Sequence, residues 1–351
     1  MLQRALALVI VICAFGIAHG QPRGAATAPP RAAGREMKVA ILLAPEKSST
    51  DAALPGLDAA KKHGRIAVAV RLAARGDDRG VVIDRLAADA PDLIIAVGAV
   101  YTDAFRAASG RHPATHFLLL DAELPNIPNV KAITFRADEG SFLAGVAAAA
   151  ESKRGAVGFV GAMETPVSQA LECAYETGVR WAAKELKRTV RGSLVYIGTT
   201  ADAFSDPAHG AAVSRTMIAQ KNVDVLYAAA GASSAGVFEA AREAKVKAIT
   251  VDTEQNHLDR DVLITSVRKR LDRAIDAAIA DVRKQAFHGG VVEMNLANGG
   301  VDLALPGRLA PATRKLVEKA RAAILSGREA ACVKYEEAPP AWNFPPRPAA
   351  P

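Results

Sequence analysis

The chain has 351 residues, of which 44 are Lys or Arg and 37 are Asp or Glu, so its formal net charge is +7. Half of the residues are hydrophobic and 5% are aromatic, which excludes a chain that is disordered throughout. Beyond residue 20 no uninterrupted apolar run approaches the roughly 20 residues that span a bilayer, so a polytopic membrane protein is excluded. Basic and acidic residues are interspersed, and this gives little support for nucleic-acid binding.

Residues 1–20 have the pattern of a secretory signal peptide. Arg4 supplies the positive start, residues 5–17 form a short apolar stretch, and Ala18-His19-Gly20 offers a cleavage site. A lipid anchor at Cys13 is not expected, because the residue before it is not the small one that lipidation requires. Cleavage would leave 43 basic and 37 acidic residues, a net charge of +6, and two cysteines. The sequence therefore predicts an exported, periplasmic protein.

The two remaining cysteines are Cys173 and Cys332. In an oxidising compartment they can form one disulfide, provided that their Cα atoms lie close enough. The alternative is a pair of buried thiols that pack as small hydrophobic residues. A catalytic cysteine is not expected, since neither has a neighbouring His in the sequence.

Between a leader at 21–36 and a proline-dense tail at 337–351, both expected to be irregular, short apolar runs alternate with helical stretches. The predicted strands cover 38–43, 66–70, 93–97, 116–120, 130–135, 156–161, 193–197, 223–228 and 247–251. The predicted helices cover 54–63, 81–90, 101–108, 139–152, 167–186, 210–220, 236–244, 271–287 and 313–326. This alternation predicts an α/β protein with two doubly wound parallel-sheet lobes that bind a ligand at the carboxyl ends of their strands.

Several enzyme classes are disfavoured by missing motifs. The first strand is followed by residues 44–51, which contain no glycine, so the dinucleotide-binding pattern is absent. There is no phosphate-binding Gly-Lys-Ser/Thr loop and no Gly-x-Ser-x-Gly. His112 and His116 have helical metal-ligand spacing, but Pro113 breaks that geometry and predicts two loop histidines. We therefore expect neither catalysis nor a bound metal or cofactor.

Charged residues at strand ends are the candidate ligand contacts. Asp121 ends one apolar run and Asp252 ends another, where a carboxylate can accept hydrogen bonds from vicinal hydroxyls such as those of a sugar. A helix N-cap is the alternative role for either one. Lys269 follows the run 264–267 and would lie near the lobe junction, where it could donate a hydrogen bond to a ligand oxygen. The alternative is an exposed surface lysine within the basic segment 268–270.

Seven segments, taken together and in chain order, resemble the basic membrane protein family of ABC-transporter solute-binding proteins, which includes purine nucleoside receptors. They lie at 139–145, 158–163, 204–210, 229–231, 236–238, 251–255 and 265–272. The resemblance implies a type I periplasmic-binding-protein fold with three crossovers between its lobes. Lobe one would comprise 37–137 and 266–290, and lobe two 138–265 and 291–336.

The resemblance also implies roles for individual residues. Asp121, Asp252 and Lys269 would bind ribose hydroxyls. Phe204 would stack on the base, although a core position is the alternative, and Gly231 belongs to one of the matching segments at the site. Tyr101 is expected to add aromatic surface.

One segment departs from the family pattern. After the first strand the family usually carries an Asn-Asp pair and then an aromatic residue that closes the other side of the base. Residues 45–50 contain neither, although Glu46 can accept a hydrogen bond from a base N–H. The ligand is therefore open between a purine nucleoside, another nucleoside or a free base, and a compound that is not a purine.

These observations predict a monomeric receptor that closes around a small polar solute and delivers it to a membrane permease. A soluble sensor that feeds a membrane signalling receptor is the alternative from another class. An enzyme on a Rossmann-like fold is the least favoured alternative, because the sequence offers no nucleophile–base pair.

Overall fold

The computed structural model describes residues 36–43, 55–72, 77–252, 262–304 and 309–333. The expected signal peptide, Cys13, Glu46 and the proline-dense tail lie outside these residues. Within them, the predicted strands and helices all overlap observed elements, with ends that differ by a few residues. Among the described residues no helix is long and apolar enough to cross a membrane.

The first lobe is built on a six-stranded, all-parallel sheet in the order β11-β5-β4-β3-β1-β2. Its strands are β1 (Met37–Leu43), β2 (Ile66–Leu72), β3 (Leu93–Val97), β4 (His116–Leu120), β5 (Val130–Phe135) and β11 (Gly290–Met294). Helices α2 (Arg79–Ala88) and α3 (Thr102–Arg111) contribute to the core on one face, and α8 (Leu271–Arg283) with the helical residues 55–60 to that on the other. The sheet is therefore buried between two helical layers, which is why its central strands are continuous apolar runs.

The second lobe repeats this arrangement with the sheet order β12-β10-β9-β8-β6-β7. Its strands are β6 (Ala156–Gly161), β7 (Arg191–Tyr196), β8 (Val225–Ala229), β9 (Lys247–Asp252), β10 (Leu263–Lys269) and β12 (Val301–Ala304). Helices α4 (Ala137–Glu151), α5 (Pro166–Glu185) and α9 (Pro311–Leu325) pack in one core cluster, and α6 (Pro207–Lys221) and α7 (Ser234–Glu243) in the other. Only β12 is antiparallel to its neighbour among the strand pairs described.

Helices α4 and α5 cross at two glycines. A Cβ on Gly145 would overlap the carbonyl oxygen of Tyr175, and a Cβ on Gly178 would overlap that of Phe142. Because only glycine permits this approach, the two helices form one tightly packed layer against the second sheet.

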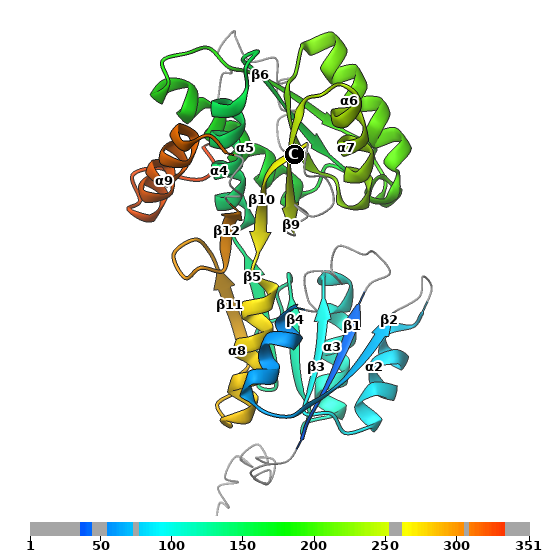
Figure 1. The fold of residues 1–351 in the computed structure, drawn as a ribbon. Coiled ribbons are helices and arrows are strands. Elements are labelled where there is room, and N and C mark those ends of the chain that lie inside the picture. Colours follow the sequence, from blue (N-terminus) through cyan, green and yellow to red (C-terminus); the bar gives the residue numbers. More distant parts are fainter. Residues whose placement is uncertain (1–35, 44–54, 73–76, 253–261, 305–308, 334–351) are drawn as a thin grey trace, which may run out of the picture.

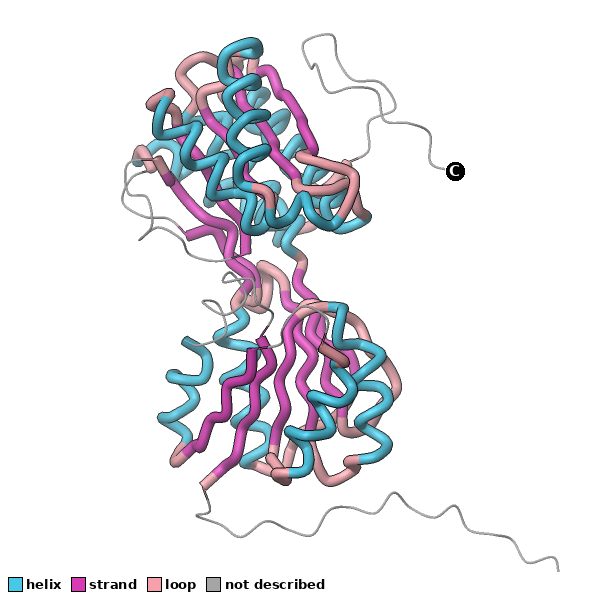
Figure 2. The backbone as a smooth tube through the Cα atoms, turned by 90° about the vertical axis from the view of Figure 1, so that its right-hand side faces the viewer, coloured by secondary structure: helices cyan, strands magenta, loops and turns pink. Residues whose placement is uncertain are grey.

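The lobes are joined where the chain passes from one sheet to the other (Figures 1 and 2). It crosses between β5 and α4, between β10 and α8, and between β11 and β12. Strand β10 stays in the second sheet as far as Lys269 and β11 in the first sheet as far as Met294. The changes of lobe therefore fall about four residues after the expected boundaries at 266 and 290.

A disulfide fastens the C-terminal segment to lobe two. Cys173 on α5 is bonded to Cys332, with 5.2 Å between their Cα atoms. Beside the bond, the backbone N–H of Val333 donates to Thr177 Oγ1 at 3.1 Å. Of the two alternatives, a disulfide or two buried thiols, the structure has the disulfide. The bond joins residues that are 159 positions apart in the sequence.

Removing this bond should destabilise the protein. We expect C173A/C332A to lose about 2–5 kcal/mol of unfolding free energy, because the unfolded chain is no longer cross-linked. Urea denaturation of the oxidised protein measures the loss. Reductant should weaken the wild type in the same way and leave the double variant unchanged; a wild type that is equally stable with its thiols fully reduced would contradict this role.

Candidate functional site

The carboxyl ends of the parallel strands of both sheets point toward the junction between the lobes. In Figure 1 the arrowheads of β1, β3 and β4 point toward lobe two, and those of β9 and β10 point toward lobe one. Loops at these edges are where open α/β sheets bind ligands. The candidate site is therefore built from two facing sets of strand ends.

The two predicted aspartates lie at equivalent places in the two lobes. Asp121 follows β4 and Asp252 is the last residue of β9, and these strands hold the same position in the two sheet orders. Asp252 is opposite Arg268 of β10 in the sheet register; its side chain is outside the described part of the structure. The fold thus brings one carboxylate-bearing residue to the junction from each lobe.

Lys269 meets Asp121 across the junction. Its Nζ lies 2.9 Å from Asp121 Oδ2, although the residues are 148 positions apart in sequence. The Lys269 side chain is 11% exposed and that of Asp121 is 39% exposed. Asp121 has a left-handed φ of 60° and donates its N–H to the Ile133 carbonyl at 2.7 Å. It is not a helix N-cap, because no helix begins between it and β5.

Phe204 and Gly231 lie side by side in lobe two. Phe204 is in the short helix η3 (Ala201–Ser205), and Gly231, with a φ of +57°, begins η4 (Gly231–Ser233). A Cβ on Gly231 would be 3.3 Å from Phe204 Cδ1, so the glycine leaves room for the ring. Phe204 is 37% exposed and is therefore a surface residue rather than a core one.

A buried serine holds the loop that carries Phe204. Ser233 Oγ donates to the Ala203 carbonyl at 2.7 Å and accepts the N–H of Asp206 at 2.7 Å. Asp206 in turn accepts the N–H of His209 at the start of α6. This arrangement fixes the backbone on both sides of the Phe204 ring.

One predicted site residue does not contribute in the expected way, and another lies outside the described residues. Tyr101 is 1% exposed and packs in the core with Phe105 and Ala108, while Arg79 lies over its ring at 5.8 Å. The expectation of exposed aromatic surface at Tyr101 was wrong, because the short helix η2 (Ala99–Tyr101) directs this side chain inward. Glu46 falls outside the described residues.

Two matching Arg-x-Asp turns lie where the chain enters α4 and α8, at the first and second crossovers between the lobes, which we call the hinge. The sequence analysis did not identify them. Arg136 pairs with Asp138 through its Nε and Nη2, at 2.9 and 2.7 Å, and Arg270 pairs with Asp272 in the same way at 2.8 and 2.7 Å. The backbone N–H of each arginine donates to the third crossover, at the carbonyl of Met294 or of Gly300, both at 2.8 Å. The sequence does contain a signal for these turns, because Arg-x-Asp occurs at the start of both helices, at 136–138 and 270–272.

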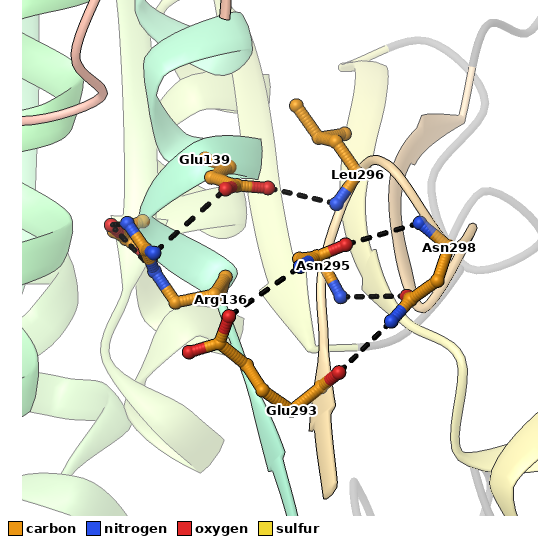
Figure 3. Close-up of polar contacts among 7 residues, drawn as sticks. Arg136, Glu139, Glu293, Asn295, Leu296 and Asn298 are labelled. Atoms are coloured by element: carbon orange, nitrogen blue, oxygen red, sulfur yellow. Dashed lines mark hydrogen bonds and ion pairs between the residues drawn. The ribbon is translucent and has the colours of Figure 1, made fainter. Parts of the chain in front are cut away.

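Helices α4 and α8 each also hydrogen-bond to the third crossover, between β11 and β12, through a side chain. Glu139 Oε2 on α4 accepts the backbone N–H of Leu296 at 2.8 Å (Figure 3). On α8, Arg273 Nη1 donates to the Gly299 carbonyl at 2.9 Å. Burial raises the pKa of Glu139, while the Leu296 N–H and the Arg136 charge oppose that rise.

The third crossover itself is a tight turn closed by its own side chains. Asn295 and Asn298 exchange side-chain-to-backbone hydrogen bonds, since each carboxamide oxygen accepts the other residue's N–H, at 2.9 and 3.0 Å (Figure 3). Residues 295–300 therefore act as a compact element between the first turns of α4 and α8.

The two histidines with metal-ligand spacing are used for other contacts. His112 Nε2 lies 2.9 Å from Asp84 Oδ1, and the His116 ring lies against Phe287 with 4.6 Å between centroids. In the described ranges no group of three or more His, Cys, Asp or Glu side chains is placed to hold a metal ion.

Comparisons with known proteins identify the family of the chain. The family model described as ABC transporter substrate-binding protein, PnrA-like, matches residues 44–328. The ABC transporter nucleoside-binding protein BmpA of Lactococcus lactis is 32% identical over 254 residues, covering 67% of this chain and 70% of that protein. Basic membrane protein A of Borreliella burgdorferi is 30% identical over 251 residues, covering 70% and 71%. The resemblance to the basic membrane protein family is confirmed.

Solved structures share the fold. An ABC transporter solute-binding protein from Aeropyrum pernix superposes with a TM-score of 0.71 at 25% identity, covering 83% of this chain and 92% of its own. One from Conexibacter woesei gives a TM-score of 0.66 at 21% identity, covering 84% and 98%. The predicted two-lobed α/β class is confirmed.

Glu139 provides a test of the hinge. We expect E139A to lose about 1–3 kcal/mol of unfolding free energy, because the N–H of the buried Leu296 is left without its acceptor. E139Q is the matched control: it keeps a side-chain oxygen there and should lose less than about 1 kcal/mol. Urea denaturation compares them, and equal stability of E139A and the wild type would show that the contact does not hold the crossover.

Proposed function

The chain belongs to the PnrA-like family of ABC transporter substrate-binding proteins, and we propose that it captures a nucleoside between its two lobes and delivers it to a membrane permease. The observation that carries the proposal is the Asp121–Lys269 contact, which joins strand ends of different lobes beside the facing carboxyl edges.

Each lobe would supply a different part of the binding energy. Asp121 and Asp252 accept hydrogen bonds from the vicinal ribose hydroxyls, and Lys269 donates to a ribose oxygen. Phe204 stacks on the base from lobe two, a contact worth roughly 1–3 kcal/mol per base in other nucleic-acid ligands, and Gly231 lets the ring approach the backbone. Glu46 accepts a hydrogen bond from a base N–H.

Binding would close the lobes by a shift of population. Only a closed state offers the ligand contacts from both lobes, so the ligand stabilises that state by its differential affinity. The hinge provides the pivot, because α4 and α8 both begin at the third crossover. No covalent bond is made or broken, and the receptor acts as a monomer on the permease.

Nucleosides are favoured as the ligand class by the name of the Lactococcus lactis relative, a nucleoside-binding protein. Export would follow from residues 1–20 acting as a cleaved signal peptide, which would place the mature chain outside the cytoplasmic membrane beside its permease.

A ligand screen tests the function directly. We expect purine or pyrimidine nucleosides to raise the melting temperature, because a ligand that binds the native state stabilises it by RT ln(1 + [L]/Kd). Free ribose and free bases, which each offer half of the contacts, should produce smaller shifts. A screen in which no nucleoside or base gives a shift in melting temperature or heat in calorimetry would overturn the proposal.

The carboxylate of Asp252 can be tested once a nucleoside ligand is found. We expect D252A to weaken its affinity about 10- to 150-fold, the loss of a charge-assisted hydrogen bond of about 1.5–3 kcal/mol. Glu185→Ala is the control, since Glu185 is an acid of the same lobe at the far end of α5, paired with Lys319. Isothermal titration calorimetry measures both, and equal affinities would remove Asp252 from the site.

A further inference from the structure

The loop between β6 and α5 lies at the edge of lobe two that faces the junction. Strand β6 is parallel to β8, and β8 is parallel to β9, so the carboxyl ends of all three strands lie at this edge. The loop is hydrogen-bonded to the segment that leads to Phe204, because the Ala162 carbonyl accepts the Gly198 N–H at 3.0 Å. A Cβ on Gly198 would be 3.2 Å from the Cβ of Ala203. The loop 162–165 and the loop that carries Phe204 are therefore neighbours.

A buried serine fixes the backbone on both sides of Glu164 in this loop. Ser168, which is 7% exposed, accepts the N–H of Thr165 at 2.7 Å and donates to the carbonyl of Met163 at 2.8 Å. Ser233 holds the neighbouring loop in the same way, by donating to a carbonyl before the aromatic residue and accepting an N–H after it. The side chain of Glu164 is exposed, but its backbone position is fixed.

The carboxylate of Glu164 is oriented by a neutral partner. Its Oε1 accepts a hydrogen bond from Nε2 of Gln169, near the start of α5, at 2.8 Å. In the ranges that the structure describes, the Glu164 side chain makes no other hydrogen bond and no ion pair, so Oε2 keeps its capacity to accept. Glu164 is not the N-cap of α5, since Thr165 has that role. The loop therefore holds an acceptor at the facing edge that the fold itself does not use.

We propose that Glu164 accepts a hydrogen bond from an N–H group on the edge of the ligand's base, and that Gln169 positions its carboxylate. This inference rests on the proposed function and adds to it a specificity-determining residue of lobe two, separate from Glu46 in lobe one.

The chemistry of a carboxylate decides what this contact selects. It only accepts hydrogen bonds, and such charge-assisted bonds are stronger than neutral ones. Each of the common bases carries an N–H group on its Watson–Crick edge, so the contact adds affinity for all of them. It selects against a ring that has no N–H donor.

Two nucleoside analogues whose bases carry no N–H group test this role by calorimetry. Purine riboside is the reference for adenosine, inosine and guanosine, and pyrimidin-2-one riboside is the reference for uridine and cytidine. We expect the wild type to bind a common nucleoside about 10- to 150-fold more tightly than its reference, which corresponds to one charge-assisted hydrogen bond. E164A should lose this ratio, by weakening the nucleoside and leaving the reference unchanged, and E164Q should keep part of it.

Glu185→Ala is the matched control, an acid at the far end of the same helix, paired with Lys319, and should keep the wild-type ratio. Because Glu164 is exposed, we expect E164A to have the unfolding free energy of the wild type in urea denaturation. Q169A should lower the ratio about 2- to 10-fold, because the carboxylate is then no longer held in one orientation.

The outcomes separate this inference from the proposed function. If the wild type binds nucleosides and E164A has the same ratio of nucleoside to reference affinity, the inference is overturned while the proposed function stands. A wild type that binds no nucleoside overturns both.

Discussion

The third crossover is the constraint on which the two-lobed architecture depends. Residues 295–300 are held from the lobe-two side by the first turn of α4 and from the lobe-one side by the first turn of α8. Matching backbone hydrogen bonds from Arg136 and Arg270 add to this grip. Both helices therefore begin beside the same short element, and the contacts of their first turns with it set how the two lobes are joined.

The same local design is repeated in both lobes. Each has a sheet in the same order, an aspartate at the end of the corresponding strand, a positive-φ glycine turn and an Arg-x-Asp turn into a helix. The facing edges of the two lobes therefore present the same backbone arrangement with different side chains.

Sequence patterns identified the elements that bury apolar residues on both faces. Most central strands are continuous apolar runs and were predicted to within a few residues, whereas β10, which has Thr265 and Ser266 at its centre, and the edge strands β11 and β12 were not among the predicted strands. β11 is half exposed and carries Glu293, and β12 has only four residues, so neither has a distinctive periodicity. Asp121 and Lys269 were predicted at strand ends, and the structure places them 2.9 Å apart because those strand ends converge; their role in ligand binding stays a prediction. The burial of Tyr101 and the Cys173–Cys332 distance depend on tertiary packing, which spacing does not encode.

The direct contact between Lys269 and Asp121 also constrains which ligands can enter. A solute that inserts between these two charges must provide an acceptor for the ammonium and a donor for the carboxylate to replace the hydrogen bond that they lose. A hydroxyl group satisfies both demands, and a vicinal pair satisfies them with two atoms in fixed geometry. An apolar group of the same size would separate the ion pair without compensation. Sites of this kind reject analogues that lack the hydroxyl far more strongly than they distinguish apolar rings, so recognition at the junction should be strict for the sugar and permissive for the base.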